Sequence, residues 1–191
     1  MDSPTPEEEG KKKIKEENTF PVPFALVDIK ENTNIRSNQY KEQIINQAIN
    51  FHLQGDIAEA KKMYQNLVNK RCNDHRVFSN YAIILQDLGK LKEAESSLSK
   101  AIELKSDFAY AYSNLGNVLR NLGKLKEAEL SERKAIELNP DFAEAHSNLG
   151  IILKDLGNLQ EAEFSYRKAI EIKSDFAGAH CNLGNILSDL G

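Results

Sequence analysis

Apolar side chains recur along this chain at the spacing of an α-helix, in runs separated by regularly placed glycines. Between residues 109 and 138, one run of apolar residues three or four positions apart ends before Gly123, and a second run begins at Leu125. This spacing is typical of two amphipathic helices joined by a tight turn, in which glycine takes the left-handed conformation that ends the first helix. Each such segment is therefore predicted to be a helical hairpin.

Five glycines recur every 34 residues and mark the ends of the predicted first helices. They are Gly55, Gly89, Gly123, Gly157 and Gly191. Alignment on these glycines brings alanines of the second helices into register, at Ala60, Ala94, Ala128 and Ala162. A fixed period of this length is typical of stacked helical repeats. We predict an array over residues 38–191, with units near 41–74, 75–108, 109–142 and 143–176 and a partial unit over 177–191.

The segment before the array has a different composition. Four of the five prolines lie in the first 23 residues, among mixed charges and without sustained apolar periodicity. Such a segment cannot bury enough apolar surface to offset the entropy lost on ordering. Residues 1–37 are therefore predicted to be a flexible N-terminal leader. Its apolar run at residues 21–29 is interpreted either as a docking peptide or as a segment that folds back on the array.

The hairpins are expected to stack, because one hairpin cannot bury its apolar stripe alone. Small residues on the first helices should let the second helices approach closely; these are Ala82, Gly116, Gly150 and Gly184. Polar residues also stand before each new hairpin, where an N-cap side chain would accept a hydrogen bond from the first helical turn. The predicted N-caps are Asn73, Asp107, Asp141 and Asp175.

The aligned columns follow a fixed order of aromatic, Leu-Gly, large apolar, Gly, Ala, aromatic, Ala and Pro. The unit that begins at Ala109 has Tyr112, Leu115, Gly116, Leu119, Gly123, Ala128, Ala135 and Pro140 in these columns. Over residues 40–191 the chain therefore resembles the tetratricopeptide repeat family. The resemblance implies an all-α fold, a right-handed superhelical solenoid of helical hairpins. It also implies that the first helices line an inner groove that faces the ligand.

Two features depart from the family pattern. Glu132 occupies the second-helix column that holds Tyr64, Leu98 and Tyr166 in the other units, so a carboxyl group stands where an apolar side chain normally packs. This side chain is expected to turn outward or to reach a basic neighbour. The first unit is the most degenerate, as expected for a terminal repeat with one unpaired face.

Every predicted first helix carries an asparagine at the same position, and we call these five residues the asparagine ladder. The ladder consists of Asn46, Asn80, Asn114, Asn148 and Asn182. Asparagine within a helix is roughly a few tenths of a kcal/mol less favourable than alanine, so a compensating role is expected. Its amide offers a donor and an acceptor in the same sense as a peptide group. With first helices about 8–10 Å apart, an extended peptide rising about 3.3 Å per residue would meet one asparagine every third residue.

The ladder is similar to one in the tetratricopeptide arm of the O-linked N-acetylglucosamine transferases, which implies that it holds peptides by their backbone. A structural interpretation stands beside this one. The asparagines could bond between neighbouring hairpins, or could remain from duplication of the units. The persistence of Asn46 and Asn80 in the more divergent units favours peptide binding.

Further residues are predicted to line the same groove. Asn117, Arg120 and Lys154 are candidate peptide-binding residues, and the serines that precede ladder asparagines are predicted beside them. The two cations could attract an acidic side chain, but Asp87 and Asp155 alongside favour a balanced, solvated face. Family members that bind chaperones use a lysine and an asparagine at set groove positions. This chain has Ile45, Ser79 and Ser113 there, so a typical chaperone adaptor is not expected.

Composition and motifs argue against other function classes. The 25 Lys and Arg residues against 29 Asp and Glu give a net charge of −4, so nucleic acid is not an expected partner. No apolar run is long enough to span a membrane. The four histidines form no metal-ligand set and no nucleotide-binding motif occurs, so no catalytic residue, metal or cofactor is expected. Cys72 and Cys181 match neither a disulfide framework nor a zinc site, which favours a cytoplasmic location.

The sequence stops after the first helix of the fifth unit. Apolar side chains of that helix are expected to lose part of their burial, which is worth about 1.5–3 kcal/mol for each one fully buried. We therefore expect fraying, self-association through the uncapped end, or a chain that is part of a longer protein. The predicted function is a non-enzymatic scaffold that binds an extended peptide or protein in its groove. The alternative is the substrate-recognition arm of a larger enzyme, such as a glycosyltransferase, whose catalytic domain is not in this chain.

Overall fold

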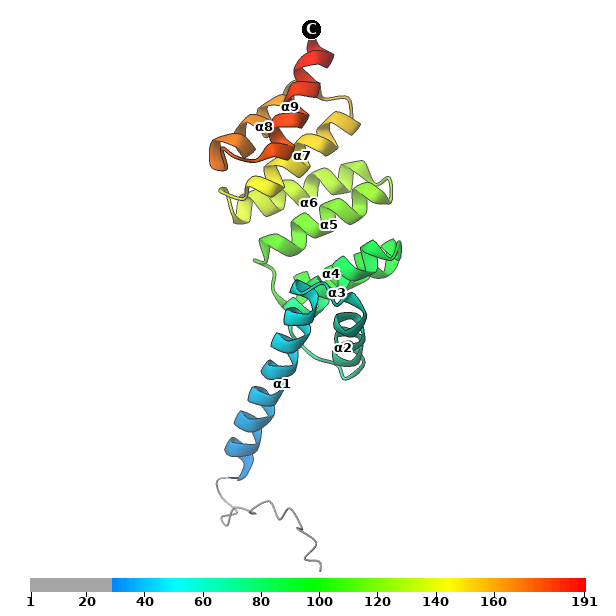
Figure 1. The fold of residues 1–191 in the computed structure, drawn as a ribbon, viewed down its shortest axis with the longest axis vertical. Helices are drawn as coiled ribbons and strands as arrows, with labels where there is room; N and C mark the ends of the chain where they lie inside the picture. The colour runs from blue at the N-terminus through cyan, green and yellow to red at the C-terminus, as the bar shows by residue number, and fades with distance from the viewer. Residues whose placement is uncertain (1–28) are drawn as a thin grey trace, which may run out of the picture. The chain divides into compact units, whose positions relative to one another are not determined.

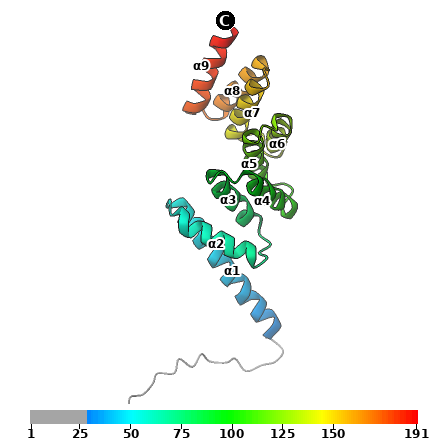
Figure 2. The ribbon, with the colours of Figure 1, turned by 90° about the vertical axis from the view of Figure 1, so that its right-hand side faces the viewer.

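The computed structural model describes the backbone of residues 29–191 and the side chains from residue 38 onward. Within these residues the chain is helical and contains no strand, so the predicted all-α helical repeat solenoid is confirmed for the described part. Residues 40–191 form one compact unit, separate from residues 1–39. In this unit the hairpins follow one another in chain order (Figures 1 and 2).

Each unit has a first and a second helix. The first helices are α1 (Ile29–Leu53), α3 (His75–Asp87), α5 (Ala109–Asn121), α7 (Ala143–Asp155) and α9 (Ala177–Leu190). The second helices are α2 (Ile57–Asn69), α4 (Leu91–Leu104), α6 (Leu125–Leu138) and α8 (Leu159–Ile172). Helix α1 begins within the segment assigned to the leader, and the rest of the leader, residues 1–28, lies outside the described residues. The division into leader and array stays a prediction.

A glycine in the left-handed region ends each complete first helix, as the glycine column predicts. Gly89 has a φ of 72°, and its amide donates to the Gln86 carbonyl at 2.9 Å. The next amide, that of Lys90, donates to the Leu85 carbonyl at 2.8 Å. These two bonds satisfy carbonyls that the helix leaves unpaired at its end. The chain therefore reverses within two residues, which places the second helix against the first.

The predicted N-caps are wrong by one residue. Helix α3 is capped by Asp74, whose side chain accepts a hydrogen bond from the Arg76 amide at 2.9 Å. In α5, α7 and α9 the cap position is a phenylalanine that makes no side-chain capping bond: Phe108, Phe142 and Phe176. The aromatic ring packs at the junction between units instead; Phe142 is 8% exposed. At these positions a packed aromatic ring stands in place of a side-chain capping hydrogen bond. The aspartates that precede the phenylalanines make no such bond.

The apolar core runs through the array rather than lying in one centre. The aligned alanines of the second helices, Ala60, Ala94, Ala128 and Ala162, are fully buried, and clusters of buried side chains combine residues from neighbouring units. Consecutive first helices also lie against each other, α3 against α5, α5 against α7 and α7 against α9. Consecutive second helices of the described part do not pack on each other to that extent. The first helices therefore form the tighter side of the stack.

Close approach within a hairpin depends on a small residue that faces the large residue of the second-helix column. A methyl group added to Gly150 would lie 2.7 Å from Cε1 of Tyr166, and one added to Gly116 would lie 2.9 Å from Cγ of Glu132. The expectation that Glu132 turns outward or reaches a basic neighbour is wrong. Its side chain is fully buried and fills the space that Tyr166 fills in the next unit.

Candidate functional site

All five ladder asparagines lie on first helices, in α1, α3, α5, α7 and α9. Asn46 is exposed, and the other four are half-buried. Helices α3, α5, α7 and α9 contact each other in order, and Arg76 of α3 pairs with Glu42 of α1. The asparagines of neighbouring units are therefore carried on one continuous surface, which we call the ladder face. Such a surface presents amide groups at the repeat spacing of the array.

The asparagines differ in what they contact. Nδ2 of Asn148 donates a hydrogen bond to Oγ of Ser113 at 3.2 Å, and this bond joins α7 to α5. It is the bond between hairpins that the structural interpretation requires. The side-chain amides of Asn114 and Asn182 form no hydrogen bond of regular geometry with another described residue. The structure therefore gives Asn148 a role in the packing of one hairpin against the next.

Glu132 lies beneath this bond. Neither carboxyl oxygen has a hydrogen-bond partner within the described residues, and the side chain is 0% exposed. Burial disfavours the charged form and raises the pKa of Glu132 to about 9. Burial is the largest cause of this shift. Ser113 and Asn148 lie near enough to lower the pKa of Glu132, although neither makes a hydrogen bond of regular geometry to its carboxyl group. At neutral pH the carboxyl group is therefore neutral.

The two cations predicted in the groove are paired with acidic residues of the next unit. Nε of Arg120 lies 2.6 Å from Oδ2 of Asp155, and Nζ of Lys154 lies 3.4 Å from Oδ2 of Asp189. Both pairs join consecutive first helices. The charges on this part of the ladder face are balanced, as the alternative interpretation expected. Asn117, the remaining candidate, is half-buried on α5.

The serines that precede ladder asparagines do not line an open groove. Ser79 is 2% exposed, and Ser113 and Ser147 are each 4% exposed, so the prediction that they line the ligand surface is wrong. Ile45, at the equivalent position of the first unit, is fully buried. One step of 100° around the helix turns these side chains from the ladder face into the contact between hairpins.

Comparison with known protein families decides the kind of repeat. Residues 143–176 match the family model described as tetratricopeptide repeat, and residues 84–123 and 116–157 match a model described as TPR repeat. The chain contains tetratricopeptide repeats. A sequence comparison with curated proteins gave no match.

Solved structures of tetratricopeptide proteins resemble the array. The crystal structure of MamA is 26% identical, with a TM-score of 0.67 over 75% of this chain and 84% of that one. YrrB, described as a TPR protein with an unusual peptide-binding site, is 26% identical, with a TM-score of 0.63 over 70% and 69% of the two chains. The first TPR of Spaghetti (RPAP3), bound to an HSP90 peptide, is 23% identical, with a TM-score of 0.60 over 61% and 93%.

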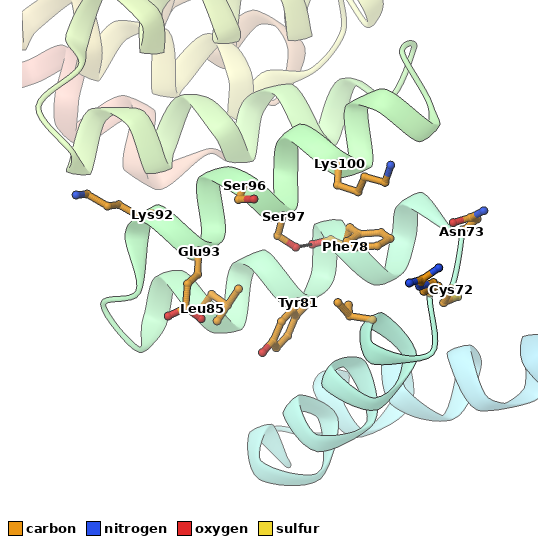
Figure 3. A pocket seen from close by; sticks show the side chains of 12 residues that line it. Cys72, Asn73, Phe78, Tyr81, Leu85, Lys92, Glu93, Ser96, Ser97 and Lys100 are labelled. Atoms are coloured by element: carbon orange, nitrogen blue, oxygen red, sulfur yellow. Dashed lines mark hydrogen bonds between the residues drawn. The ribbon is translucent and has the colours of Figure 1, made fainter.

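Sequence analysis missed a recess on the other side of the tetratricopeptide array. A groove of about 740 Å³ lies between the second helices α2 and α4, with α3 as its floor (Figure 3). We call it the α2–α4 groove. Two substitutions in the repeat columns could have indicated the groove: Ser96 where other units have Leu130 and Phe164, and Tyr81 where they have leucine.

Neither a metal-binding cluster of side chains nor a membrane-spanning helix occurs among the described residues. Among those residues, no group of three or more His, Cys, Asp or Glu side chains is placed to hold a metal ion. No described helix is both long and apolar enough to cross a membrane.

Proposed function

We propose that this chain is a protein-interaction scaffold that holds an extended peptide or protein segment on its ladder face and performs no catalysis itself. The observation that carries the proposal is the asparagine ladder, which continues through all five first helices. Two of the structures it resembles are described with peptides: YrrB by its peptide-binding site and the TPR of Spaghetti (RPAP3) by its bound HSP90 peptide.

The charges beside the ladder support recognition of backbone rather than of side chains. Arg120 and Lys154 are each engaged by an aspartate of the next unit, so a bound peptide would meet paired charges there. The amides of Asn114 and Asn182 retain donor and acceptor atoms for a ligand. A ligand held through such groups is selected by its extended conformation and by a few side-chain contacts.

The experiment that tests this proposal compares three alanine variants of the full chain against a displayed library of unstructured peptides. Asn114→Ala removes a ladder amide without breaking a regular hydrogen bond in the structure. Asn148→Ala removes the bond to Ser113 and should lower stability as well as binding. Asn66→Ala on α2 is the matched control, because it removes the same group from an exposed position off the ladder face.

Peptides selected on the wild type should bind Asn66→Ala unchanged and should lose affinity for Asn114→Ala, while the melting temperature of Asn114→Ala stays the same or rises slightly. If Asn114→Ala melts at a lower temperature and binds normally, the ladder is structural and the proposal fails. A substrate-recognition role for a larger enzyme and a cytoplasmic location remain predictions.

Self-association through α9 is a second proposal. Leu187 is 42% exposed and Leu190 is 37% exposed on this helix, which presents an apolar stripe to solvent. Light scattering of the full chain over a range of concentrations tests it. A mass that rises with concentration, and that Leu187→Glu returns to the monomer value, would support the proposal; a constant monomer mass would exclude it.

A further inference from the structure

The α2–α4 groove has an apolar floor that the fold holds in place. Val68 of α2 and Phe78, Tyr81 and Leu85 of α3 form this floor. Oγ of Ser97 on α4 donates a hydrogen bond to the Phe78 carbonyl oxygen at 2.9 Å, which fixes α4 against α3 beside the groove (Figure 3). The recess therefore belongs to the packed structure and offers a side chain of a ligand a preformed apolar seat.

A second groove lies at the equivalent place two units later, between α6 and α8. Its volume is about 540 Å³, and Leu149 and Leu153 on its floor correspond to Tyr81 and Leu85. A gap of the same kind between second helices therefore occurs at two places in the array. The two grooves can be compared residue by residue, and their differences show what is special to the first.

The α6–α8 groove is bridged by an ion pair, whereas no ion pair between described residues bridges the α2–α4 groove. Nη2 of Arg133 on α6 lies 2.9 Å from Oε2 of Glu161 on α8, so the two walls are linked. Gln65 stands at the position that corresponds to Arg133. Glu93 corresponds to Glu161. Its Oε1 lies 2.8 Å from Nζ of Lys90, at the N-terminus of the same helix, and so does not link the two walls. The α2–α4 groove is therefore open across its mouth.

One wall of the α2–α4 groove also carries a smaller side chain than the corresponding wall of the α6–α8 groove. Ser96 on α4 corresponds to Phe164 on α8, a residue that is 63% exposed and lines the other groove. The smaller serine leaves room above the aromatic floor. An apolar side chain of a ligand could take the place that Phe164 occupies in the fourth unit.

The rim carries positive charge on a chain whose net charge is −4. Arg71 and Lys92 form no ion pair with a described residue, and Lys100 pairs with Glu103 of its own helix at 2.7 Å. At the corresponding places of the α6–α8 groove, Asn139 and Gln160 are neutral. The charge is thus local to the first groove and is complementary to an acidic ligand.

We propose that the α2–α4 groove is a second protein-binding site, which takes a short peptide with a phenylalanine or leucine side chain flanked by acidic residues. The apolar side chain sits on Phe78, Tyr81 and Leu85, and the flanking carboxylates meet Arg71 and Lys92. The site lies between the second helices α2 and α4 with α3 as its floor, and none of its lining residues is a ladder asparagine, so two ligands could be bound at once.

The probe is a fluorescein-labelled peptide with one phenylalanine between glutamates, and the control peptide has lysines in place of the glutamates. Polarisation is measured with the full chain and its variants. Ser96→Phe introduces the residue of the corresponding position in the fourth unit and should fill the groove. Arg71→Asn with Lys92→Gln introduces the neutral residues of the other groove; Arg71 has a φ of 55°, a conformation that asparagine adopts readily, so this variant should fold.

Two further variants serve as controls. Lys126→Gln makes the same charge change at the position of Lys92 in the next unit, and Asn114→Ala alters the ladder face. The acidic peptide should bind the wild type and both controls alike, with an affinity that falls as salt is raised. Loss of two exposed charge contacts should weaken binding on the order of tenfold in the double variant, and Ser96→Phe should weaken it further.

Several results would overturn the proposal. They are no binding of the acidic peptide to the wild type, equal binding of the lysine peptide, or binding that survives both groove variants. Binding that Asn114→Ala abolishes would place the peptide on the ladder face instead. Light scattering completes the test: a wild-type dimer that Ser96→Phe converts to a monomer would make a second copy the occupant.

Discussion

Replacing Glu132 by leucine should stabilise the array, and the gain should grow as pH rises. Glu132 is 0% exposed and neither oxygen has a hydrogen-bond partner among the described residues. Leu98 fills the same column in the second unit and is also fully buried. The exchange therefore removes a desolvated acid and leaves a side chain that the column already accommodates.

The magnitude follows from the pKa of Glu132, which burial raises to about 9 from the ordinary value of 4.5. The folded state holds the proton over this interval, whereas the unfolded state releases it. The free energy of unfolding is therefore highest below about pH 4.5 and falls by about 1.4 kcal/mol for each pH unit up to about pH 9. At pH 7 the loss amounts to about 3 kcal/mol, and Glu132→Leu should recover it and add burial of apolar surface.

Urea unfolding followed by circular dichroism, at several pH values between about 5 and 8, measures the effect. The difference in unfolding free energy between Glu132→Leu and the wild type should increase with a slope close to 1.4 kcal/mol per pH unit. Glu132→Gln is the control: it removes the titration but retains a buried polar group, so its curve should also be flatter than that of the wild type and lie below that of the leucine variant. Parallel pH profiles for the wild type and Glu132→Leu would refute the argument, because they would mean that the carboxyl group titrates normally.

Three other substitutions test the packing. Gly150→Ala should lower the unfolding free energy by about 1–3 kcal/mol, because the new methyl group would overlap the Tyr166 ring; an unchanged urea midpoint would show that the ring gives way. Gly184→Ala, which meets no atom within 4 Å, should instead raise helix stability by about 1 kcal/mol, detectable as a higher melting temperature. Arg120→Ala should change the unfolding free energy by less than about 1 kcal/mol, since its pair with Asp155 is partly exposed, and a larger loss would show that the pair is not a simple surface contact.

The features that the sequence predicted well are those that depend on local structure. A glycine that must adopt positive φ, as Gly89 does, marks a helix end regardless of what packs around it. The apolar spacing then sets the two helices of each hairpin. The capping prediction was wrong because it rested on residue type alone: an aspartate one position too early, such as Asp107, cannot reach the amides that the cap must satisfy.

Features that depend on the contact of three helices could not be predicted from the sequence. Whether Glu132 points inward is decided by the space that Gly116 leaves and by the helix of the next unit. The pair between Arg120 and Asp155 joins residues 35 positions apart, one more than the repeat period, so it depends on the offset between stacked hairpins. The α2–α4 groove arises from gaps between helices that the repeat pattern treats as equivalent.

The ion pairs between consecutive first helices bear on how such an array can grow. Arg120 and Lys154 occupy one position of successive units, and their partners Asp155 and Asp189 occupy the next position one unit later. A unit that carries both a cation and an aspartate in these places is compatible with another copy of itself on either side. Duplication of the fourth unit would therefore add a new pair without leaving a charge unmatched. At the earlier junction the corresponding residues are Gln86 and Asn121, so the third unit carries only the cation and the fourth unit, with Lys154 and Asp155, carries both residues.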